Sequence, residues 1–496
     1  MTVSQPVTFV DAAAADAPAR GLPLAPEHEQ PFAPPELYES WRSDGKVLVI
    51  DPPSGRWWIG QSSRVEQGRD KVRHVNTLTE PVDPAYEDYP VMLAVIKNKD
   101  CNLGCTYCFA EADTTRAYLT GEKICSLFHQ ILANFPNKQK IVFLFSGGEP
   151  LLHFKTIREA VARFTEEAEP AQRERVMWGI MTNGTPITDE VAGFFREYGF
   201  NVCVSIDGPP EIHDRNRPVL NSSRGSHAKV EEKLELLTSH GLSYSNICTI
   251  VEPEDLMPTF DYQVGKGRRN LYMRPLRMQG RQISGEGSSA VEEYFDTQHV
   301  MASEFLRMAD RIIEYNRTHD DKIVEQTIAN HVRHLIDPKK TFMCLKGPCG
   351  AGAGAKMGVD WEGNLYPCDT LVEFPELQIA SATQVDHSRD FAQLFRDSHV
   401  LKQMSGRRPE HIRECSQCHV QKFCGSGCTA TSYSVHGNLR SPSDRCDYER
   451  ALFEGLLWRF YDQPDSAPLL LGMERSTKRS QWARPSVLEM CTGGAL

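Results

Sequence analysis

The chain has 496 residues, of which 40% are hydrophobic and 24% charged, and its 66 acidic and 55 basic side chains give a formal net charge of −11. Such a chain can bury several domain cores, which excludes a wholly disordered protein. No apolar run approaches the roughly 18 residues of a membrane-spanning helix, and the N-terminus does not resemble a signal peptide. We therefore expect a cytoplasmic protein without a membrane partner, and the acidic balance argues against non-specific nucleic-acid binding.

The part of the chain before the first cysteine divides into a tail and a small domain. Residues 1–35 are rich in alanine and proline, so we expect a disordered or extended tail. Apolar runs at 46–50 and 56–59 flank Pro52-Pro-Ser-Gly55 and predict two strands joined by a turn. We assign residues 36–90 to a small N-terminal α+β domain.

From residue 91 to about 285, apolar runs alternate with segments of helical period. This alternation predicts an α/β fold, an open, partial (β/α)6 barrel whose helices cover the outer face of a parallel sheet. The expected strands lie at 91–96, 141–145, 176–181, 202–206, 247–251 and 271–273, and the expected helices near 117–134, 154–168, 187–198, 226–239 and 255–264. A helical linker (286–340), a cysteine-rich domain (341–462) and a loosely held C-terminal tail (463–496) are expected to follow.

The 15 cysteines are unevenly spread, and none precedes Cys101. In a reducing cytosol, clustered cysteines are more often metal ligands or catalysts than disulfide partners. One group follows the first predicted strand and consists of Cys101, Cys105 and Cys108. A second field of eight comprises Cys344, Cys349, Cys368, Cys415, Cys418, Cys424, Cys428 and Cys446.

The first group lies on a loop at the carboxyl end of a strand, the edge at which α/β barrels carry chemistry. Three thiolates can hold three irons of a cubane cluster and leave the fourth iron open. A zinc site completed by a distant residue is the alternative.

The run Cys101-Asn-Leu-Gly-Cys-Thr-Tyr-Cys108 reproduces the CxxxCxxC motif of the radical SAM superfamily, which the sequence resembles over about residues 91–280. Ser146-Gly-Gly-Glu-Pro150 resembles the family's GGE motif, and Thr182-Asn-Gly184 and Ser205-Ile-Asp-Gly-Pro209 follow the next two strands. The resemblance implies a [4Fe-4S] cluster and S-adenosyl-L-methionine (SAM), which is cleaved to a 5′-deoxyadenosyl radical. Alternatively, the glycines form a tight turn and the Ser205 segment caps a helix. The implied cofactor contacts are Tyr107, Ser146, Gly147, Gly148, Glu149, Asn183, Ser205 and Asp207.

The second cysteine field resembles the SPASM iron-sulfur extension of radical SAM enzymes. Eight thiolates suit two fully ligated cubanes, so we expect three [4Fe-4S] clusters in all. By resemblance to anaerobic sulfatase-maturing enzymes, one auxiliary cluster takes Cys344, Cys349, Cys368 and Cys428, and the other takes Cys415, Cys418, Cys424 and Cys446. The same resemblance makes Asp369 a candidate general base, against the alternative of a solvated loop aspartate. A pair of zinc ribbons is the alternative for the cysteines.

The resemblance implies an oxidoreductase that modifies a peptide or protein substrate and takes electrons from a donor such as flavodoxin or ferredoxin. We predict a thioether or carbon–carbon crosslink, with residues 36–90 as a candidate binding domain for a leader peptide. Formylglycine-type oxidation of Ser or Cys in a sulfatase is the alternative reaction. Two other classes remain, a zinc-stabilised interaction protein and a nucleic-acid binder that uses the basic residues at 475–484.

Overall fold

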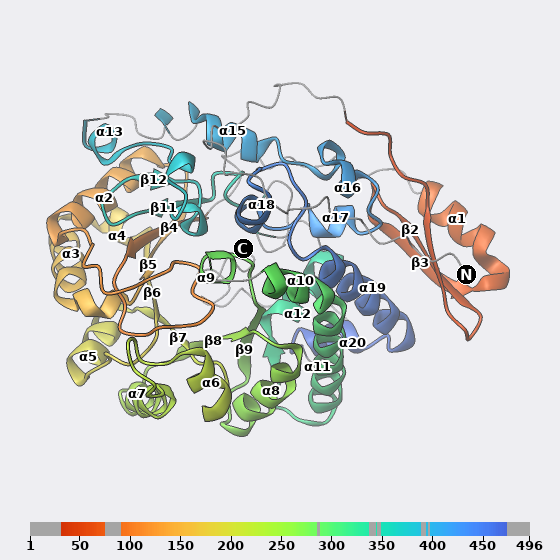
Figure 1. Ribbon diagram of the computed structural model, residues 1–496, viewed down its shortest axis with the longest axis horizontal. Helices are drawn as coiled ribbons and strands as arrows, with labels where there is room; N and C mark the ends of the chain where they lie inside the picture. Colours follow the sequence, from red (N-terminus) through yellow and green to blue (C-terminus); the bar gives the residue numbers. More distant parts are fainter. Residues whose placement is uncertain are drawn as a thin grey trace.

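The computed structural model describes residues 31–74, 91–284, 288–336, 344, 349–387, 393–394 and 397–473. Within this part of the chain, the strands form one sheet of nine and one of three (Figure 1). No described helix is both long enough and apolar enough to cross a membrane. Residues 1–30 of the expected tail (1–35) and the basic segment at 475–484 lie outside the described residues.

The larger sheet has the strand order β10-β9-β8-β7-β6-β5-β4-β11-β12, and its six central strands run parallel in chain order. They lie where the sequence predicts strands, because apolar runs of this kind form sheets that are covered on both faces. Their bounds are β4 (Val91–Asn98), β5 (Lys140–Gly147), β6 (Val176–Thr182), β7 (Asn201–Ser205), β8 (Tyr244–Ile250) and β9 (Asn270–Pro275).

Helices lie along the outside of these strands in Figure 1. Two begin at threonine caps, where the Thr120 and Thr188 hydroxyls accept the N–H groups of Lys123 and Val191. The bounds are α2 (Gly121–Asn134), α3 (Phe154–Glu167), α4 (Pro170–Glu174), α5 (Asp189–Tyr198), α6 (Pro210–Asn216), α7 (His227–Ser239) and α8 (Leu256–Gly265).

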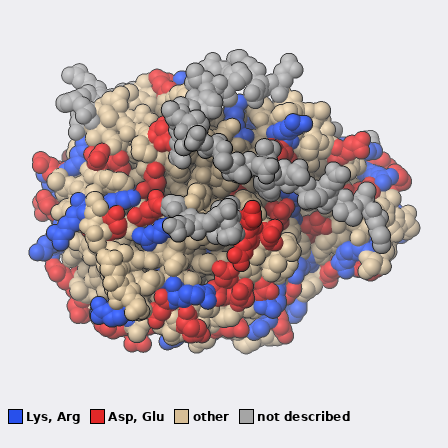
Figure 2. Space-filling view, viewed as in Figure 1, with Lys and Arg blue, Asp and Glu red and all other residues tan. Residues whose placement is uncertain are grey.

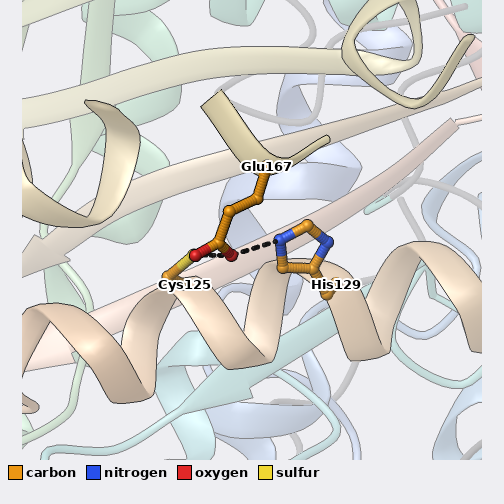
Figure 3. A group of neighbouring side chains, drawn as sticks. All are labelled: Cys125, His129 and Glu167. Carbon is orange, nitrogen blue, oxygen red and sulfur yellow. Dashed lines mark hydrogen bonds and ion pairs between the residues drawn. The ribbon is translucent and has the colours of Figure 1, made fainter. Parts of the chain in front are cut away.

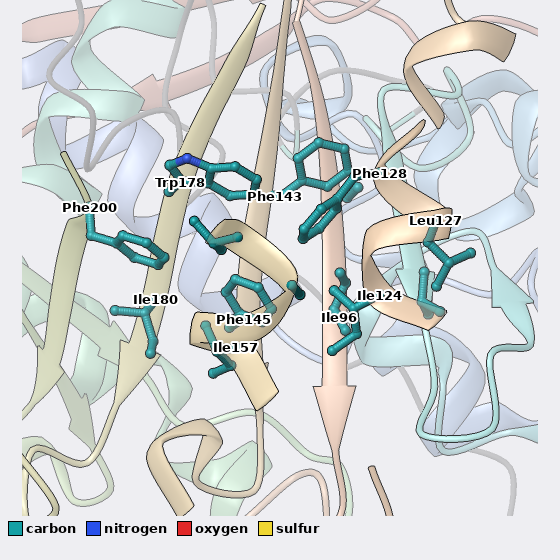
Figure 4. Close-up of a cluster of buried hydrophobic side chains, with 14 of the residues drawn as sticks. Ile96, Ile124, Leu127, Phe128, Phe143, Phe145, Ile157, Trp178, Ile180 and Phe200 are labelled. Carbon is teal, nitrogen blue, oxygen red and sulfur yellow. The ribbon is translucent and has the colours of Figure 1, made fainter. Parts of the chain in front are cut away.

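An aromatic cluster joins this helix layer to the sheet (Figure 4). Phe128 of α2 packs against Phe143 of β5 and Trp178 of β6, with ring centroids 4.4 and 5.0 Å apart. Such contacts fix the helices against the strands, and the parallel register brings the carboxyl ends of β4 to β9 to one edge.

Three short strands extend the sheet beyond the six expected ones. β10 (Val324–Glu325) pairs in parallel with β9, and β11 (Lys356–Val359) pairs in parallel with β4. β12 (Leu365–Tyr366) returns antiparallel to β11. These strands provide hydrogen-bond partners for backbone groups at the edges of the sheet. Strands of two to four residues are too short to show an alternating pattern of hydrophobic residues, so the sequence does not reveal them.

The region expected to be a helical linker belongs to a packed core. Phe305, Met308 and Ile312 of α11 are buried together with Leu452 and Leu456 of α19. The expected linker contains α10 (Ser288–Asp296), α11 (Gln298–Thr318) and α12 (Gln326–Ile336). The short helix α9 (Arg281–Ser284) precedes it, and α19 (Cys446–Asp462) packs on α11 from the C-terminal part of the chain.

The structure also differs from the expected C-terminal tail. Residues 463–473 include α20 (Ser466–Leu470), whose Leu469 and Leu470 are buried in the same core as α11. Apolar burial outweighs the extended preference that the prolines suggest. Residues 474–496 lie outside the described part.

The cysteine-rich part consists of short helices joined by turns. These are α13 (Ala382–His387), α15 (His399–Ser405), α16 (Arg413–Ser416), α17 (Gln421–Cys424) and α18 (Thr429–His436).

The N-terminal part forms a small antiparallel sheet of β1 (Tyr38–Trp41), β2 (Lys46–Asp51) and β3 (Arg56–Gln61). The hairpin between the last two contains the turn that the sequence predicts. Val47 and Val49 pack toward α1 (Val65–His74) on one face. Residues 75–90 of the expected domain are outside the described part.

Candidate active site

A cavity of about 160 Å³ lies at the carboxyl ends of the central strands. Its wall takes residues from the ends of β5, β6 and β7 and from the loop that follows β4. Parallel strands bring these distant segments to one edge, which is why the predicted motifs meet. The predicted site residues in its lining are Cys101, Cys105, Tyr107, Cys108, Ser146, Gly147, Gly148, Asn183 and Ser205.

The three cysteines of the loop all face this cavity. The Cys101 sulfur accepts the Leu103 N–H at 3.4 Å and lies 3.8 Å from the Asn183 amide nitrogen. Burial raises the pKa of Cys101 to about 12 and that of Cys105 to about 11, so the thiolate forms require a nearby cation. Three converging sulfurs with N–H donors are the donor set that an open-sited cubane needs, and this site therefore fits such a group.

The double-glycine turn supports the cysteine loop from behind. Gly147 has a φ of +118°, and a Cβ on Gly148 would overlap the carbonyl oxygen of Asp100. The Gly148 N–H donates to Asn98 O at 2.9 Å, and the Glu149 N–H donates to Asp100 O at 2.8 Å. Only glycine permits this approach, so the turn fixes the backbone just before Cys101.

Glu149 lies behind the wall and is not among the residues that line the cavity. Its carboxylate accepts the Asn183 N–H at 2.6 Å, the Thr182 hydroxyl at 2.7 Å and the Leu151 N–H at 3.0 Å. Burial raises its pKa to about 7. In this structure the side chain holds the Thr182–Asn183 segment in the wall, and direct contact with a cofactor stays a prediction.

Asp207 also lies behind the wall, where it organises a buried network. Its carboxylate accepts from Arg217 Nε at 2.9 Å, from the Tyr107 hydroxyl and from the Thr249 N–H at 2.9 Å. The Arg217 guanidinium lines the cavity, 5.2 Å from the Tyr107 ring centroid and 3.9 Å from the Cys105 sulfur. Nothing in the sequence singles out Arg217, because only the fold brings the Arg215-Asn-Arg-Pro218 run to the cysteine loop.

The ammonium of Lys356 lies among cysteines of the second field, 4.0 Å from the Cys368 sulfur. Burial raises the pKa of Cys344 to about 11; Lys356 opposes this shift, and Cys349 and Cys428 add to it. Lys356 was not among the predicted site residues, although a charged residue inside the apolar run Ala355-Lys-Met-Gly-Val359 is a signal in the sequence that could have indicated it.

The other four cysteines also interact with one another. The pKa of Cys424 is raised by burial, then by Glu449 and by the thiols of Cys446, Cys415 and Cys418. Cys415, Cys418, Cys424 and Cys446 are therefore close enough to influence one another. The assignment of the eight cysteines to two fully ligated clusters stays a prediction.

Asp369 sits beside Cys368 and does not line the cavity. Its Oδ1 accepts from the Cys368 sulfur at 3.1 Å and is 3.5 Å from Lys356 Nζ. Burial opposes the charged form, but Lys356, the Cys368 hydrogen bond, Lys97 and Arg277 together outweigh it and hold the pKa of Asp369 below its usual value. Its role as general base stays a prediction.

Carboxylates gather over α8 and α10 in Figure 2, beside the carboxyl end of β8. Burial raises the pKa of Glu252, and Glu254, Glu293 and Asp255 raise it further.

Comparison with known proteins agrees with this geometry. Residues 95–258 match the model of the Radical SAM superfamily, so the chain contains a radical SAM domain. The domain implies one [4Fe-4S] cluster and SAM, for which the cysteine loop and the adjoining cavity are the fitting site.

Relatives extend the similarity beyond this domain. The chain is 24% identical over 395 residues to a cysteine-type anaerobic sulfatase-maturating enzyme of Clostridium novyi (strain NT), which covers 73% of this chain and 94% of that protein. The solved structure of native anSMEcpe with bound AdoMet matches with a TM-score of 0.61 and 19% identity, over 75% of this chain and 99% of that one. Streptococcus suis SuiB bound to the precursor peptide SuiA matches with a TM-score of 0.50 and 13% identity, over 82% and 100%. The chain thus carries a radical SAM domain and is similar over most of its length to sulfatase-maturating enzymes.

Proposed function

We propose that this protein is a radical SAM maturase that removes hydrogen from a side chain of a peptide or protein substrate and forms a thioether or carbon–carbon crosslink. The observation that carries the proposal is the convergence of Cys101, Cys105 and Cys108 on one cavity, with two groups of four cysteines further along the chain. When bound, a cluster at the first site with SAM supplies a 5′-deoxyadenosyl radical, and clusters at the other two supply electron acceptors.

The residues of this chain orient and shield that chemistry. Arg217 and the Asn183 amide place donors near the Cys105 and Cys101 sulfurs. Met181, Ile247 and Leu276 give the cavity apolar walls that exclude water from a reactive radical. A crosslink removes two hydrogens: one leaves as an atom, and the other leaves as a proton after one electron has gone to an acceptor.

Two observations bear on the substrate. The N-terminal unit of β1–β3 and α1 stands outside the sheet that carries the cavity, which supports a role in holding a peptide by an exposed strand edge. The relationship to a sulfatase-maturating enzyme supports the second candidate, oxidation of Ser or Cys in a sulfatase to formylglycine. An electron donor such as flavodoxin or ferredoxin and a cytoplasmic location belong to the same proposal.

The test is an anaerobic assay with SAM, a low-potential reductant and the substrate encoded beside this protein. Replacement of Cys101, Cys105 and Cys108 by Ala should abolish 5′-deoxyadenosine formation, whereas Cys203→Ala, a buried cysteine of β7, should leave it in place. Continued cleavage in the triple variant contradicts the assignment of the site.

A second pair of variants tests the auxiliary sites. Cys415→Ala with Cys418→Ala should remove about four of about 12 irons and stop product formation while some SAM cleavage continues. If metal analysis finds zinc in place of iron, the result favours the alternative that the chain is a zinc-stabilised interaction protein. A product that has lost two hydrogens and gives no aldehyde reaction indicates a crosslink, and an aldehyde indicates formylglycine.

A further inference from the structure

A separate group of metal-ligating side chains lies on the outer helices of the sheet. Cys125 and His129 stand one turn apart on α2, and Glu167 is the last residue of the neighbouring α3. One ligand atom from each lies within 4.8 Å of the other two, and Figure 3 shows the three side chains turned toward one another. Neither the cavity nor the two groups of four cysteines includes them.

Two of the three distances between ligand atoms in this group match the edges of a tetrahedral zinc site. The Glu167 Oε2 atom is 3.7 Å from Cys125 Sγ and 3.3 Å from His129 Nε2. Tetrahedral zinc with ordinary bond lengths separates sulfur from oxygen by about 3.6 Å and nitrogen from oxygen by about 3.4 Å. An ion therefore fits between these atoms with little movement of the side chains.

His129 supplies an independent observation. Its Nε2 atom is shielded from solvent and is directed at the Glu167 carboxylate, with which it forms an ion pair at 3.3 Å. The ring packs on Phe164 of α3, with centroids 5.0 Å apart, so it is held in this orientation. A bound cation would accept the lone pair of this nitrogen and would bridge it to the Glu167 carboxylate.

Arg163 orients the carboxylate that completes the group. Its Nε donates to Glu167 Oε1 at 2.6 Å, which leaves Oε2 directed at Cys125 and His129. Metal-binding carboxylates are commonly fixed in this way by an outer partner. A thiolate and a carboxylate also balance the charge of a divalent cation.

We propose that Cys125, His129 and Glu167 bind a divalent cation of the zinc class, which clamps α2 to α3. Mixed sulfur, nitrogen and oxygen donors favour zinc over calcium or magnesium, and water supplies the fourth ligand. The site lies on the helix layer outside the sheet and needs nothing from the radical chemistry, so it stands or falls independently of the proposed function.

The full-length protein with its clusters loaded provides the test. After mild chelation, one equivalent of zinc chloride is added, and alkylation of Cys125 is followed on the tryptic peptide 124–138, which contains no other cysteine. Zinc should slow this alkylation at least tenfold and raise the unfolding temperature by several degrees. His129→Gln and Glu167→Gln should lose both effects, and Glu166→Gln, the exposed neighbour, should keep them.

Full protection in Glu167→Gln overturns the proposal, as do equal alkylation rates with and without zinc when Cys125 reacts measurably in the zinc-free protein. Because Cys125 is only 2% exposed, its alkylation can be slow even without zinc. Equilibrium dialysis then decides: the wild type should retain one zinc per chain more than Cys125→Ser, and equal zinc contents refute the site.

Discussion

The buried imidazole of His213 shows how one side chain holds the wall of the cavity in place. The Asp207 N–H donates to its Nδ1 at 3.2 Å, and its Nε2 lies 3.0 Å from the Ser226 hydroxyl. That hydroxyl donates to Arg217 O at 2.6 Å, so the ring must be neutral, with its proton on Nε2. Burial lowers the pKa of His213 to about 4.

This shift predicts a loss of stability in acid. Between about pH 6.5 and pH 4 the unfolded chain binds a proton at His213 that the folded protein excludes, so the stabilisation is complete above that range and falls as pH decreases. The shift corresponds to at most about 3 kcal/mol. Denaturant unfolding at pH 7.5 and pH 5 should show a smaller pH-dependent loss in His213→Gln, which keeps an acceptor and a donor.

His299→Gln, an exposed position on α11, is the matched control and should keep the wild-type pH dependence. If His213→Gln loses as much stability as the wild type between the two pH values, His213 does not stay neutral in the folded protein.

At the scale of elements, the Gly147-Gly148 turn and the loop before Cys101 form one unit. Backbone hydrogen bonds join the turn to Asn98 and Asp100, and Glu149 continues the unit to the end of β6. The position of the cysteine loop therefore depends on a close approach of two backbones.

Gly148→Ala tests this dependence. The added methyl group overlaps Asp100 O, a backbone atom, so we expect at least 2–3 kcal/mol of destabilisation and weaker SAM binding. Equilibrium dialysis with SAM and urea unfolding measure the two effects. Gly193→Ala on α5 meets nothing within 4 Å and should instead stabilise the protein by about 0.5–1 kcal/mol. Equal behaviour of the two variants would contradict the packing described here.

At the scale of the whole molecule, the N-terminal sheet is docked on the cysteine-rich part. Leu48 and Ile50 are buried with Phe423 and Phe453, on the face of the sheet opposite α1. With both faces of the sheet occupied, a leader peptide would have to bind at a strand edge.

Leu48→Ala should therefore destabilise the protein by about 2–5 kcal/mol through a cavity at this interface. Limited proteolysis should show earlier cleavage within residues 31–74 than in the wild type. Trp41→Ala removes a side chain that is 56% exposed on the same sheet and should change stability by less than about 0.5 kcal/mol. An unchanged proteolysis pattern in Leu48→Ala would mean that this sheet does not depend on the docked face.

The sequence by itself determined the six parallel strands, the motifs at their ends and the grouping of cysteines. These features are local: apolar runs mark covered strands, and short cysteine spacings mark a ligand loop. It did not reveal β10 to β12, the burial of α20 or the roles of Arg217 and Lys356, because those depend on packing between segments far apart in the chain.

The same division separates the two kinds of metal site. The cysteine loop and the eight-cysteine field are visible as spacings in the chain. Cys125, by contrast, is an ordinary core cysteine in the sequence, and only the packing of α2 beside α3 brings His129 and Glu167 to it. Tertiary structure decides such sites because ligand atoms must meet within a few ångströms, which no local pattern specifies.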